Sequence, residues 1–397
     1  MLTTRSTSAL MAEACAIRDR AYGTHITYSP KVFLPLTMLC RDRCGYCTFA
    51  KAPARLENPF LPIAEAIEIA RAGAALGCTE ALFTLGEAPE DRYAVAAEWL
   101  HENGFQSTVE YLIAAATAVH TETGLLPHAN AGSLTVDEFR ALREVAPSQG
   151  IMLETLAEVE AHRGAPDKLA GRRLAALADA GEADVALTTG ILVGIGESEI
   201  DRVESLEAIV DLHAKYGHIQ EVIVQNFLPK PGTAMAHYPA APQEAFLRAI
   251  ALARIILPPE ISVQAPPNLS EDPVTLLKAG INDFGGVSPI TLDHVNPERP
   301  WPSLEGLRET TARAGFQLVP RLTIYPRFQT PRFLASEMMT AVLGHADAHG
   351  YARADSWYSG ADTAPTGDSH VHIPVDPAII HSGSIASELE NVITGVR

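Results

Sequence analysis

The chain has 397 residues, of which 47% are hydrophobic and 20% are charged, as is typical of a folded protein with a sizeable core. Its formal net charge of −18 disfavours nucleic acid as a partner, because phosphate binding needs a basic surface. No apolar run reaches the roughly eighteen residues of a membrane-spanning helix, so the sequence predicts no membrane association.

Short apolar runs alternate with helical patterns along most of the chain. Residues 1–31 are predicted to form a short helix and an extended lead-in. Helical spacing is clear at Ile63, Ile67, Ala70 and Ala74, and similar patterns separate most of the apolar runs. The predicted strands are residues 32–39, 80–87, 125–131, 151–156, 185–193, 221–227, 261–265 and 282–287.

This alternation predicts an α/β fold, a (β/α)8 TIM-like barrel over residues 32–322. A doubly wound open sheet is the alternative. Residues 323–397 are expected to form a C-terminal extension that packs on the barrel or serves as a linker. In either fold, ligand-binding residues should lie at the C-terminal ends of the strands.

Three cysteines follow the first predicted strand. Cys40, Cys44 and Cys47 leave gaps of three and two residues, and Tyr46 precedes the last of them. Three thiolates this close can hold one corner of an iron–sulfur cube, which normally takes four cysteine ligands. The fourth iron is then open to a ligand that is not protein, as in catalytic metal sites.

The other interpretations of these cysteines are weaker. Five cysteines in 397 residues do not indicate a disulfide framework. A structural zinc site would need a second pair of ligands, and no such pair follows downstream. Cys15 and Cys78 lie alone in helical patterns and are interpreted as small buried hydrophobic residues.

The cysteine loop resembles that of the radical S-adenosylmethionine (SAM) enzymes. The resemblance implies a 4Fe-4S cluster held by Cys40, Cys44 and Cys47, with SAM on the fourth iron and Tyr46 beside the adenine. In that family, reductive cleavage of SAM gives a 5′-deoxyadenosyl radical that abstracts a hydrogen atom. The run 84–87 (TLGE) resembles the family's GGE element, which implies that Gly86 and Glu87 bind the ammonium group of SAM.

Two further elements match this family. Glu154 ends the predicted fourth strand, where relatives place a polar residue on the SAM ribose. The run 190–197 (GILVGIGE) resembles the G-x-I-x-G-x-x-E element, in which Gly194 and Gly196 would permit close approach to the adenine.

The later strands resemble the 7,8-didemethyl-8-hydroxy-5-deazariboflavin synthases, in particular their second-step subunit or half. The matching strings are 221–233, 264–269 and 282–289, supported by 33–37 and 126–132. The resemblance implies a lyase that converts 5-amino-5-(4-hydroxybenzyl)-6-(D-ribitylimino)-5,6-dihydrouracil, the tyrosine–ribitylaminouracil adduct, to the deazaflavin with loss of ammonia. It also implies a first-step synthase subunit or domain and a low-potential electron donor as partners. A cytoplasmic, reducing setting fits both the net charge and an oxygen-labile cluster.

Polar residues at the later strand ends are the predicted substrate and catalytic residues. Amide groups suit a uracil edge and a ribityl chain, and carboxylates and imidazole can move protons. The predicted substrate ligands are Asn226, Gln264 and Asn268, and the predicted catalytic residues are Asp283, Asp293 and His294.

Two competing functions are compatible with the cysteine loop. One is another barrel-type radical SAM enzyme, such as a futalosine-pathway cyclase or a biotin-synthase relative. The other is a non-catalytic iron–sulfur electron-transfer protein, which would have full cysteine ligation and no SAM binding.

Overall fold

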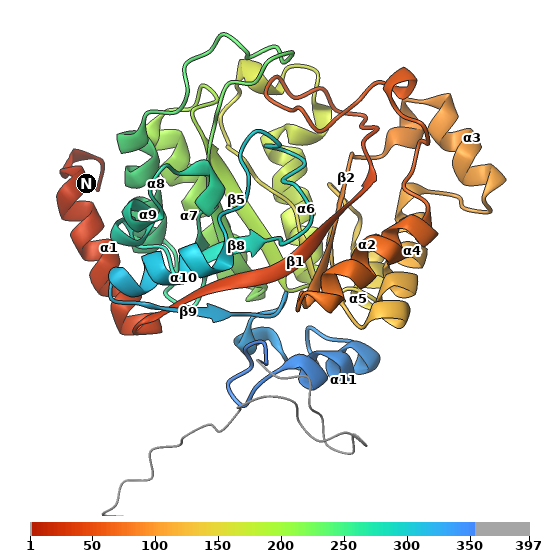
Figure 1. The fold of residues 1–397 in the computed structure, drawn as a ribbon. Coiled ribbons are helices and arrows are strands. Elements are labelled where there is room, and N and C mark those ends of the chain that lie inside the picture. The colour runs from red at the N-terminus through yellow and green to blue at the C-terminus, as the bar shows by residue number, and fades with distance from the viewer. Residues whose placement is uncertain (1, 354–397) are drawn as a thin grey trace, which may run out of the picture. The chain divides into compact units, whose positions relative to one another are not determined.

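The computed structural model describes residues 2–353 and has a closed parallel barrel surrounded by helices (Figure 1). The strands run in the order β2-β3-β4-β5-β6-β7-β8-β1, and a further pairing of β1 with β2 closes the ring. They are β1 (His25–Thr37), β2 (Glu80–Leu85), β3 (Leu126–Asn130), β4 (Ser148–Gly150), β5 (Leu187–Val193), β6 (Ile219–Asn226), β7 (Ser262–Gln264), β8 (Asp283–Val287) and β9 (Gln317–Pro320). The predicted barrel is confirmed, and closure excludes the open sheet.

Closure depends on β1, which is much longer than its neighbours. Its later part pairs with β2, from Lys31 opposite Glu80 onward. Its earlier part pairs with β8, with Ser29 opposite Gly286, and also with the short β9. β1 therefore closes the ring by pairing with both β2 and β8.

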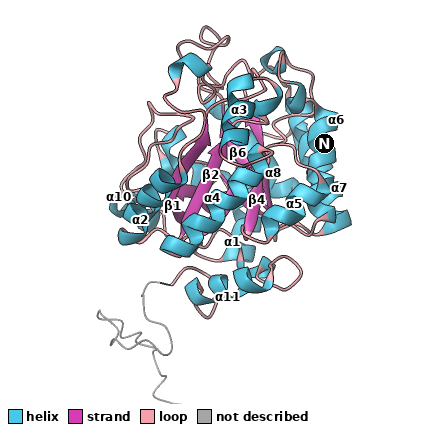
Figure 2. Ribbon diagram, turned by 90° about the vertical axis from the view of Figure 1, so that its right-hand side faces the viewer, coloured by secondary structure: helices cyan, strands magenta, loops and turns pink. Residues whose placement is uncertain are grey.

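Helices cover the outside of the barrel, as the view by secondary structure makes plain (Figure 2). Several begin at side-chain caps; Thr135 with Glu138 and Ser198 with Asp201 form capping boxes. The helices are α1 (Thr7–Tyr22), α2 (Ile63–Ala75), α3 (Ala94–Glu102), α4 (Thr108–Thr123), α5 (Val136–Arg143), α6 (Ala170–Glu182), α7 (Glu199–Tyr216), α8 (Gln243–Ile256), α9 (Pro273–Ala279), α10 (Leu304–Arg313) and α11 (Ser336–His345).

The main apolar core lies between the strands and these helices. Every residue of β5 is buried, as expected for a parallel strand covered on both faces. Apolar residues of the helices pack onto the same core, for example Ile250 of α8 and Leu112 of α4. This shell fixes the strands whose ends carry the polar residues.

Three elements differ from the sequence-based expectation. The first strand begins at His25, inside the predicted lead-in 1–31. The fourth strand is 148–150 and precedes the predicted 151–156, where Glu154 has a left-handed φ of +68° and makes only an isolated bridge to Ile191. The strand β9 was not predicted, because its four residues are too few for a periodic pattern.

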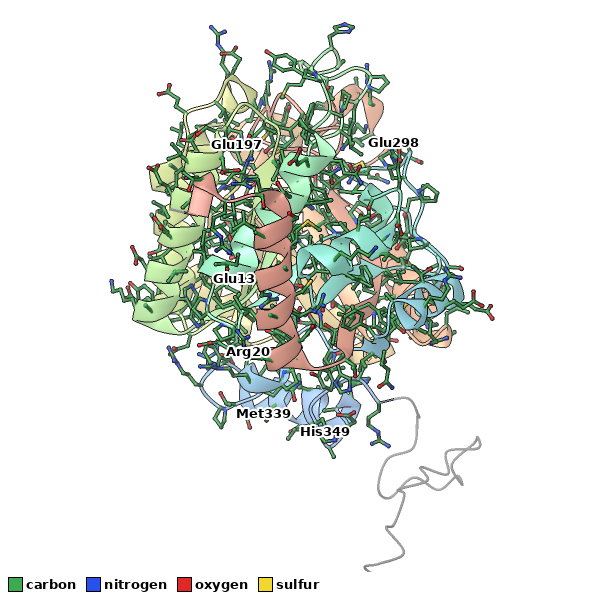
Figure 3. All side chains as sticks on the ribbon, turned by 90° about the vertical axis from the view of Figure 1, so that its left-hand side faces the viewer. Glu13, Arg20, Glu197, Glu298, Met339 and His349 are labelled. Atoms are coloured by element: carbon green, nitrogen blue, oxygen red, sulfur yellow. The ribbon has the colours of Figure 1, made fainter. Side chains whose placement is uncertain are left out.

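The loops that follow the strands gather at one end of the barrel. Glu197, after β5, and Glu298, after β8, lie at this end, and Met339 of α11 and His349 lie at the other (Figure 3). No helix within residues 2–353 is both long and apolar enough to cross a bilayer. Of the predicted extension 323–397, the part beyond residue 353 lies outside the described residues.

Candidate active site

A cavity of about 380 Å³ runs from the cysteine loop into the barrel, and all eight barrel strands contribute to its wall. Cys40, Cys44 and Cys47 line it and are free thiols. Burial raises the pKa of Cys40 to about 11 and that of Cys44 to about 12. Thiolates are therefore unfavourable here unless a cation compensates them, as bound iron would. The three residues thus fit an iron–sulfur group.

Gly86 lets the β2 end approach the cysteine loop. A Cβ at this position would lie 1.9 Å from the carbonyl oxygen of Leu39 and 2.7 Å from Cβ of Cys40. Only glycine permits this contact between two backbones. The next residue, Glu87, donates its backbone N–H to Sγ of Cys40 at 3.2 Å. The predicted Gly86-Glu87 element is therefore adjacent to a predicted metal ligand.

The Glu87 carboxylate is buried and already bonded on both oxygens. It accepts from the backbone N–H of Ser133 at 2.7 Å and from Arg173 at 2.9 Å. Gly132, with φ of +85°, makes room, because a Cβ there would lie 2.6 Å from Cδ of Glu87. A carboxylate has about four acceptor positions, so Glu87 can still accept from a ligand.

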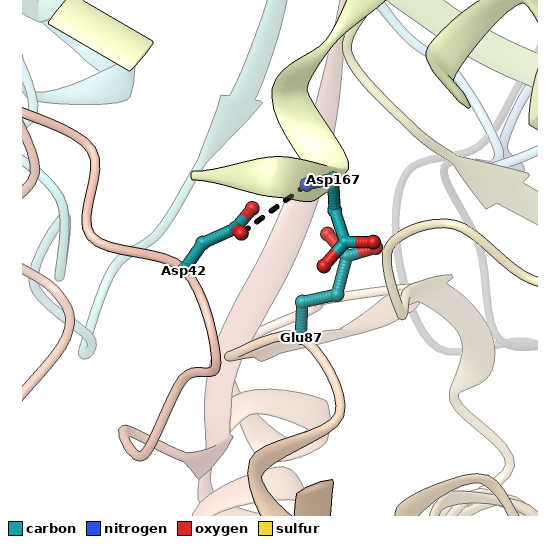
Figure 4. A group of neighbouring side chains, drawn as sticks. All are labelled: Asp42, Glu87 and Asp167. Carbon is teal, nitrogen blue, oxygen red and sulfur yellow. Dashed lines mark hydrogen bonds between the residues drawn. The ribbon is translucent and has the colours of Figure 1, made fainter. Parts of the chain in front are cut away.

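Glu87 belongs to a buried acidic group with Asp42 and Asp167 (Figure 4). Oδ1 of Asp42 accepts the backbone N–H of Asp167 at 3.3 Å, and its Oδ2 has no partner among the described residues. Burial and the negative charge of Glu87 raise the pKa of Asp42 to about 6. Asp167 is neutralised by Arg41, at 2.7 and 2.8 Å. Asp42 therefore presents an unused acceptor beside the cysteines.

Arg173 was not predicted as a site residue. It lines the cavity, is 3% exposed, and its Nε has no partner among the described residues. It lies on the buried face of α6 with Ala176, Leu177 and Ala180. The sequence could have indicated its role, because a charged residue stands there at helical spacing from buried apolar residues. Arg173 and Asp42 together offer a spare donor and a spare acceptor, which suits the carboxylate and ammonium of an amino-acid group.

Glu154 also lines the cavity, and it pairs with a lysine that the sequence did not indicate. Lys168 donates to its carboxylate at 2.5 Å. Burial alone would raise the pKa of Glu154, but the Lys168 ammonium, together with His162 and Arg173, outweighs burial and lowers the pKa. Glu154 is thus an anion that can accept hydroxyl groups. Nearby, the hydroxyl of Tyr46 lies 3.3 Å from Nε2 of His162.

The predicted glycines after β5 shape a turn outside the cavity wall. Gly194 and Gly196 have φ of +98° and +116°, which favour glycine. Glu197 accepts the backbone N–H groups of Gly194 and Ile195, each at 2.8 Å, and pairs with Arg202. The turn is therefore held by Glu197. A direct role for the two glycines in adenine binding stays a prediction.

The predicted substrate residues fall into two groups. Asn226 and Gln264 line the cavity; Oδ1 of Asn226 is unpartnered within residues 2–353, and the Gln264 amide has no hydrogen bond to any described residue. Asn268 lies behind the wall, where its amide donates to Asp293 at 3.0 Å. Asn226 and Gln264 are placed to contact a ligand, and Asn268 holds Asp293.

The predicted catalytic residues are also separated. Asp293 and His294 line the cavity in the loop after β8. Burial lowers the pKa of His294, so its imidazole is neutral near pH 7 and can accept a proton. Asp283 is fully buried below the wall and pairs with Arg321 at 2.7 Å. The structure brings Asp293 and His294 together with the cysteines but keeps Asp283 away from the cavity surface.

Comparisons with known proteins agree with this geometry. The family model described as the radical SAM superfamily matches residues 34–209. A solved structure of the FeFe-hydrogenase maturase HydG from Carboxydothermus hydrogenoformans superposes with a TM-score of 0.64. It covers 82% of this chain and 74% of that one at 23% identity, which supports the fold alone. Fold and cysteine loop together define a radical SAM barrel.

Curated relatives narrow the assignment. The FO synthase of Nocardia farcinica is 53% identical over 80% of this chain, which spans only 39% of that protein. The 7,8-didemethyl-8-hydroxy-5-deazariboflavin synthase of Methanopyrus kandleri is 46% identical over 83% of this chain and its own whole length. The chain therefore belongs to the 7,8-didemethyl-8-hydroxy-5-deazariboflavin synthase family of radical SAM enzymes. The comparisons support neither competing function.

Proposed function

We propose that this chain catalyses the second step of deazaflavin formation. The adduct 5-amino-5-(4-hydroxybenzyl)-6-(D-ribitylimino)-5,6-dihydrouracil would lose ammonia and two hydrogen atoms to give 7,8-didemethyl-8-hydroxy-5-deazariboflavin. The observation that carries the proposal is the similarity over the whole length of the Methanopyrus kandleri protein, which bears the name of this product. The cavity beside the three cysteines, with amide, carboxylate and imidazole groups in its wall, supports it.

A 4Fe-4S cluster and SAM are the cofactors we propose. Cys40, Cys44 and Cys47 would hold the cluster, and Glu87, Arg173, Asp42 and Glu154 offer the donors and acceptors that SAM requires. When bound, the pair supplies a 5′-deoxyadenosyl radical that takes one hydrogen atom, and the cluster is the acceptor for the electron left after a proton departs.

The remaining chemistry belongs to residues of the cavity. Asn226 and Gln264 would bind the substrate, because each presents an amide with unused hydrogen-bonding capacity. His294 would accept the proton, since its imidazole is neutral and faces the cavity. Asp293 would position this loop: Oδ1 accepts the backbone N–H groups of Val295 and Asn296 at 2.9 and 3.0 Å. Asp283 lies outside the cavity wall and would affect the substrate only by holding Arg321, with which it pairs.

Partners follow from the length comparison. The chain spans 39% of the Nocardia farcinica FO synthase, so we propose that another part of such longer relatives carries the first step. Here a separate first-step subunit or domain would deliver the adduct, and a low-potential donor would reduce the cluster. We place these reactions in the cytoplasm, where reducing conditions protect an oxygen-labile cluster.

The test measures whether SAM cleavage is coupled to deazaflavin formation. Anaerobically reconstituted protein is given SAM, dithionite and the adduct. We expect 5′-deoxyadenosine, ammonia and deazaflavin to form in equal amounts. His294→Ala should lower deazaflavin formation by about 10²-fold, the usual contribution of one acid–base group. His237→Ala, on an exposed loop, is the control. If the unmodified protein, given the adduct, released 5′-deoxyadenosine from SAM without forming any deazaflavin, the proposal would be contradicted.

A further inference from the structure

The deep end of the cavity carries several buried charged and polar side chains, although nothing in the cluster chemistry requires them. A set of buried residues, which we call the basal ring, lines it: Lys31, Glu80, His128, Thr188, Glu221 and Arg321. Lys31 precedes the end of β1 at Thr37 by six residues, which is about 20 Å along a strand. The basal ring thus lies well away from the cysteine loop.

One side of the basal ring comes from β1, β2 and β3. Lys31 and Glu80 are register partners and form an ion pair at 2.6 Å, which leaves two of the three ammonium N–H groups without a partner among residues 2–353. Burial lowers the pKa of His128 to about 4, so its ring is neutral. Nδ1 of His128 lies 2.7 Å from the Ser148 hydroxyl, and Nε2 lies 3.0 Å from Oδ1 of Asn130.

The other side comes from β5, β6 and the segment after β9. Arg321 bonds Glu221 at 2.8 Å and Asp283 at 2.7 Å. Thr188 donates to the second oxygen of Glu221 at 3.0 Å. The Gln264 amide, whose strand β7 pairs with β6 and β8, has no hydrogen bond to any described residue although it is 7% exposed.

Glycines keep this end of the barrel open. A Cβ at Gly286 of β8 would lie 2.5 Å from Cδ of Lys31. At Gly150 of β4 it would lie 2.2 Å from Oδ1 of Asn130 and 3.0 Å from Nε2 of His128. Glycine inside a strand is unfavourable unless close approach requires it. At Gly286 and Gly150, the absence of a Cβ gives polar side chains room to reach the barrel interior.

Charge and polarity restrict the ligand. The basal ring with Asp283 holds two cations and three carboxylates, paired within it, so it offers no excess positive charge to a phosphate. An apolar ring placed here would leave the unused Lys31 and Gln264 donors without partners, which is costly when they are buried. An uncharged chain of hydroxyl groups, each both donor and acceptor, satisfies both conditions.

We propose that the basal ring is the binding subsite for an extended, uncharged polyhydroxylated chain. Resting on the proposed function, this chain is the ribityl tail of the adduct. The tail would point toward Lys31, Glu80 and Gln264, while the benzyl carbon, which must lose hydrogen, lies at the cysteine end. The basal ring then sets the orientation of the adduct in the cavity and the specificity for its ribityl tail.

Calorimetric titration of the reconstituted holoprotein tests this without turnover. The probes are the deazaflavin product, its N10-methyl analogue, which lacks the polyol, and its 5′-phosphate. We expect the product to bind at least about 10-fold more tightly than either of the others, the equivalent of one or two net hydrogen bonds. Equal affinity of the product and the N10-methyl analogue would overturn the subsite. Tighter binding of the 5′-phosphate would make it an anion site instead.

Variants of the basal ring test which residues give the preference for the product over its N10-methyl analogue. The double variant Lys31→Met/Glu80→Gln removes the ion pair without leaving one buried charge alone. It should lose most of the preference for the product and keep its affinity for the N10-methyl analogue. Thr188→Val, a smaller change, should lower the preference in the same direction. Lys215→Met, exposed on α7, is the control and should match the unmodified protein.

Two further outcomes distinguish failure of the proposed subsite from failure of the proposed function. If Lys31→Met/Glu80→Gln and Thr188→Val weaken the product and the N10-methyl analogue equally, the basal ring shapes the whole cavity and does not read the polyol. If none of the three probes binds the unmodified protein, the proposed function fails, and the subsite fails with it.

Discussion

At the scale of single residues, the cysteine loop was the part that sequence could predict. The spacing of Cys40, Cys44 and Cys47 within eight residues predicts the metal chemistry, and the cavity includes all three. Gly86 and Glu87 were found through a short motif. Arg173 and Asp42 were missed, because their burial and their unpartnered atoms depend on segments that are distant in sequence. Lys168 was missed because only the fold brings it to Glu154.

The ligand assignment predicts the effect of cysteine substitutions. Reconstituted protein should hold about four irons and four sulfides per chain. Cys40→Ala, Cys44→Ala or Cys47→Ala should each lose the cluster, measured as iron, sulfide and visible absorbance. Cys78→Ser should retain it, since Cys78 is buried in the apolar core away from the cavity wall. Iron loss in Cys78→Ser would show that the ligands are wrongly assigned.

The contact of Gly86 with the cysteine loop predicts a second effect. In Gly86→Ala the new methyl group would meet the Leu39 backbone, so the loop must shift, at a cost of about 1–3 kcal/mol. We expect most of the iron to be lost and the melting temperature to fall. Gly171→Ala is the matched control, because a Cβ there meets nothing within 4 Å. Full iron content in Gly86→Ala would contradict this account of the loop.

At the scale of elements, strands with long apolar runs were predictable and irregular ones were not. The β5 and β6 runs agree closely with the sequence pattern. The short β4 is Ser148-Gln149-Gly150, which has no apolar signal, and its three residues are ordered by pairing with β3 and β5. Propensity was overridden there by tertiary context.

The loop between β8 and α10 covers the cavity, and its contacts predict how far SAM cleavage stays coupled to product formation. Trp301 of this loop stacks on Phe33 at 5.2 Å, and Lys230 donates to the Val295 carbonyl at 2.6 Å. Trp301→Ala should loosen this cover and admit water, so 5′-deoxyadenosine should form in excess of product by several-fold. The ratio of the two compounds is the measurement. Tyr238→Ala, an exposed aromatic residue, is the control, and an unchanged ratio in Trp301→Ala would refute a covering role.

At the scale of the whole molecule, buried neutral histidines predict acid sensitivity. Burial lowers the pKa of His218 to about 4, below its ordinary value of 6.5. The unfolded chain therefore takes up the proton first, and stability present above pH 6.5 is lost as the pH falls toward 4. We expect this residue to account for about 2 kcal/mol of unfolding free energy between pH 7 and pH 5.

Denaturation of His218→Gln at several pH values checks this. The variant should show a shallower loss of stability with acid than the unmodified protein, whatever its stability at pH 7. His101→Gln, exposed at the end of α3, should keep the original slope. A His218→Gln slope equal to that of the unmodified protein would show that His218 is not held neutral.

The assignment to the second step is tested most directly by offering each half-reaction's substrate to the purified chain. With the tyrosine–ribitylaminouracil adduct, SAM and a strong reductant, the chain alone should release a fluorescent deazaflavin, methionine, 5′-deoxyadenosine and ammonia. With free tyrosine and the diaminouracil, without a partner enzyme, it should form no chromophore and no adduct. Tyrosine-dependent SAM cleavage with adduct formation would make this chain the first-step enzyme and contradict the account.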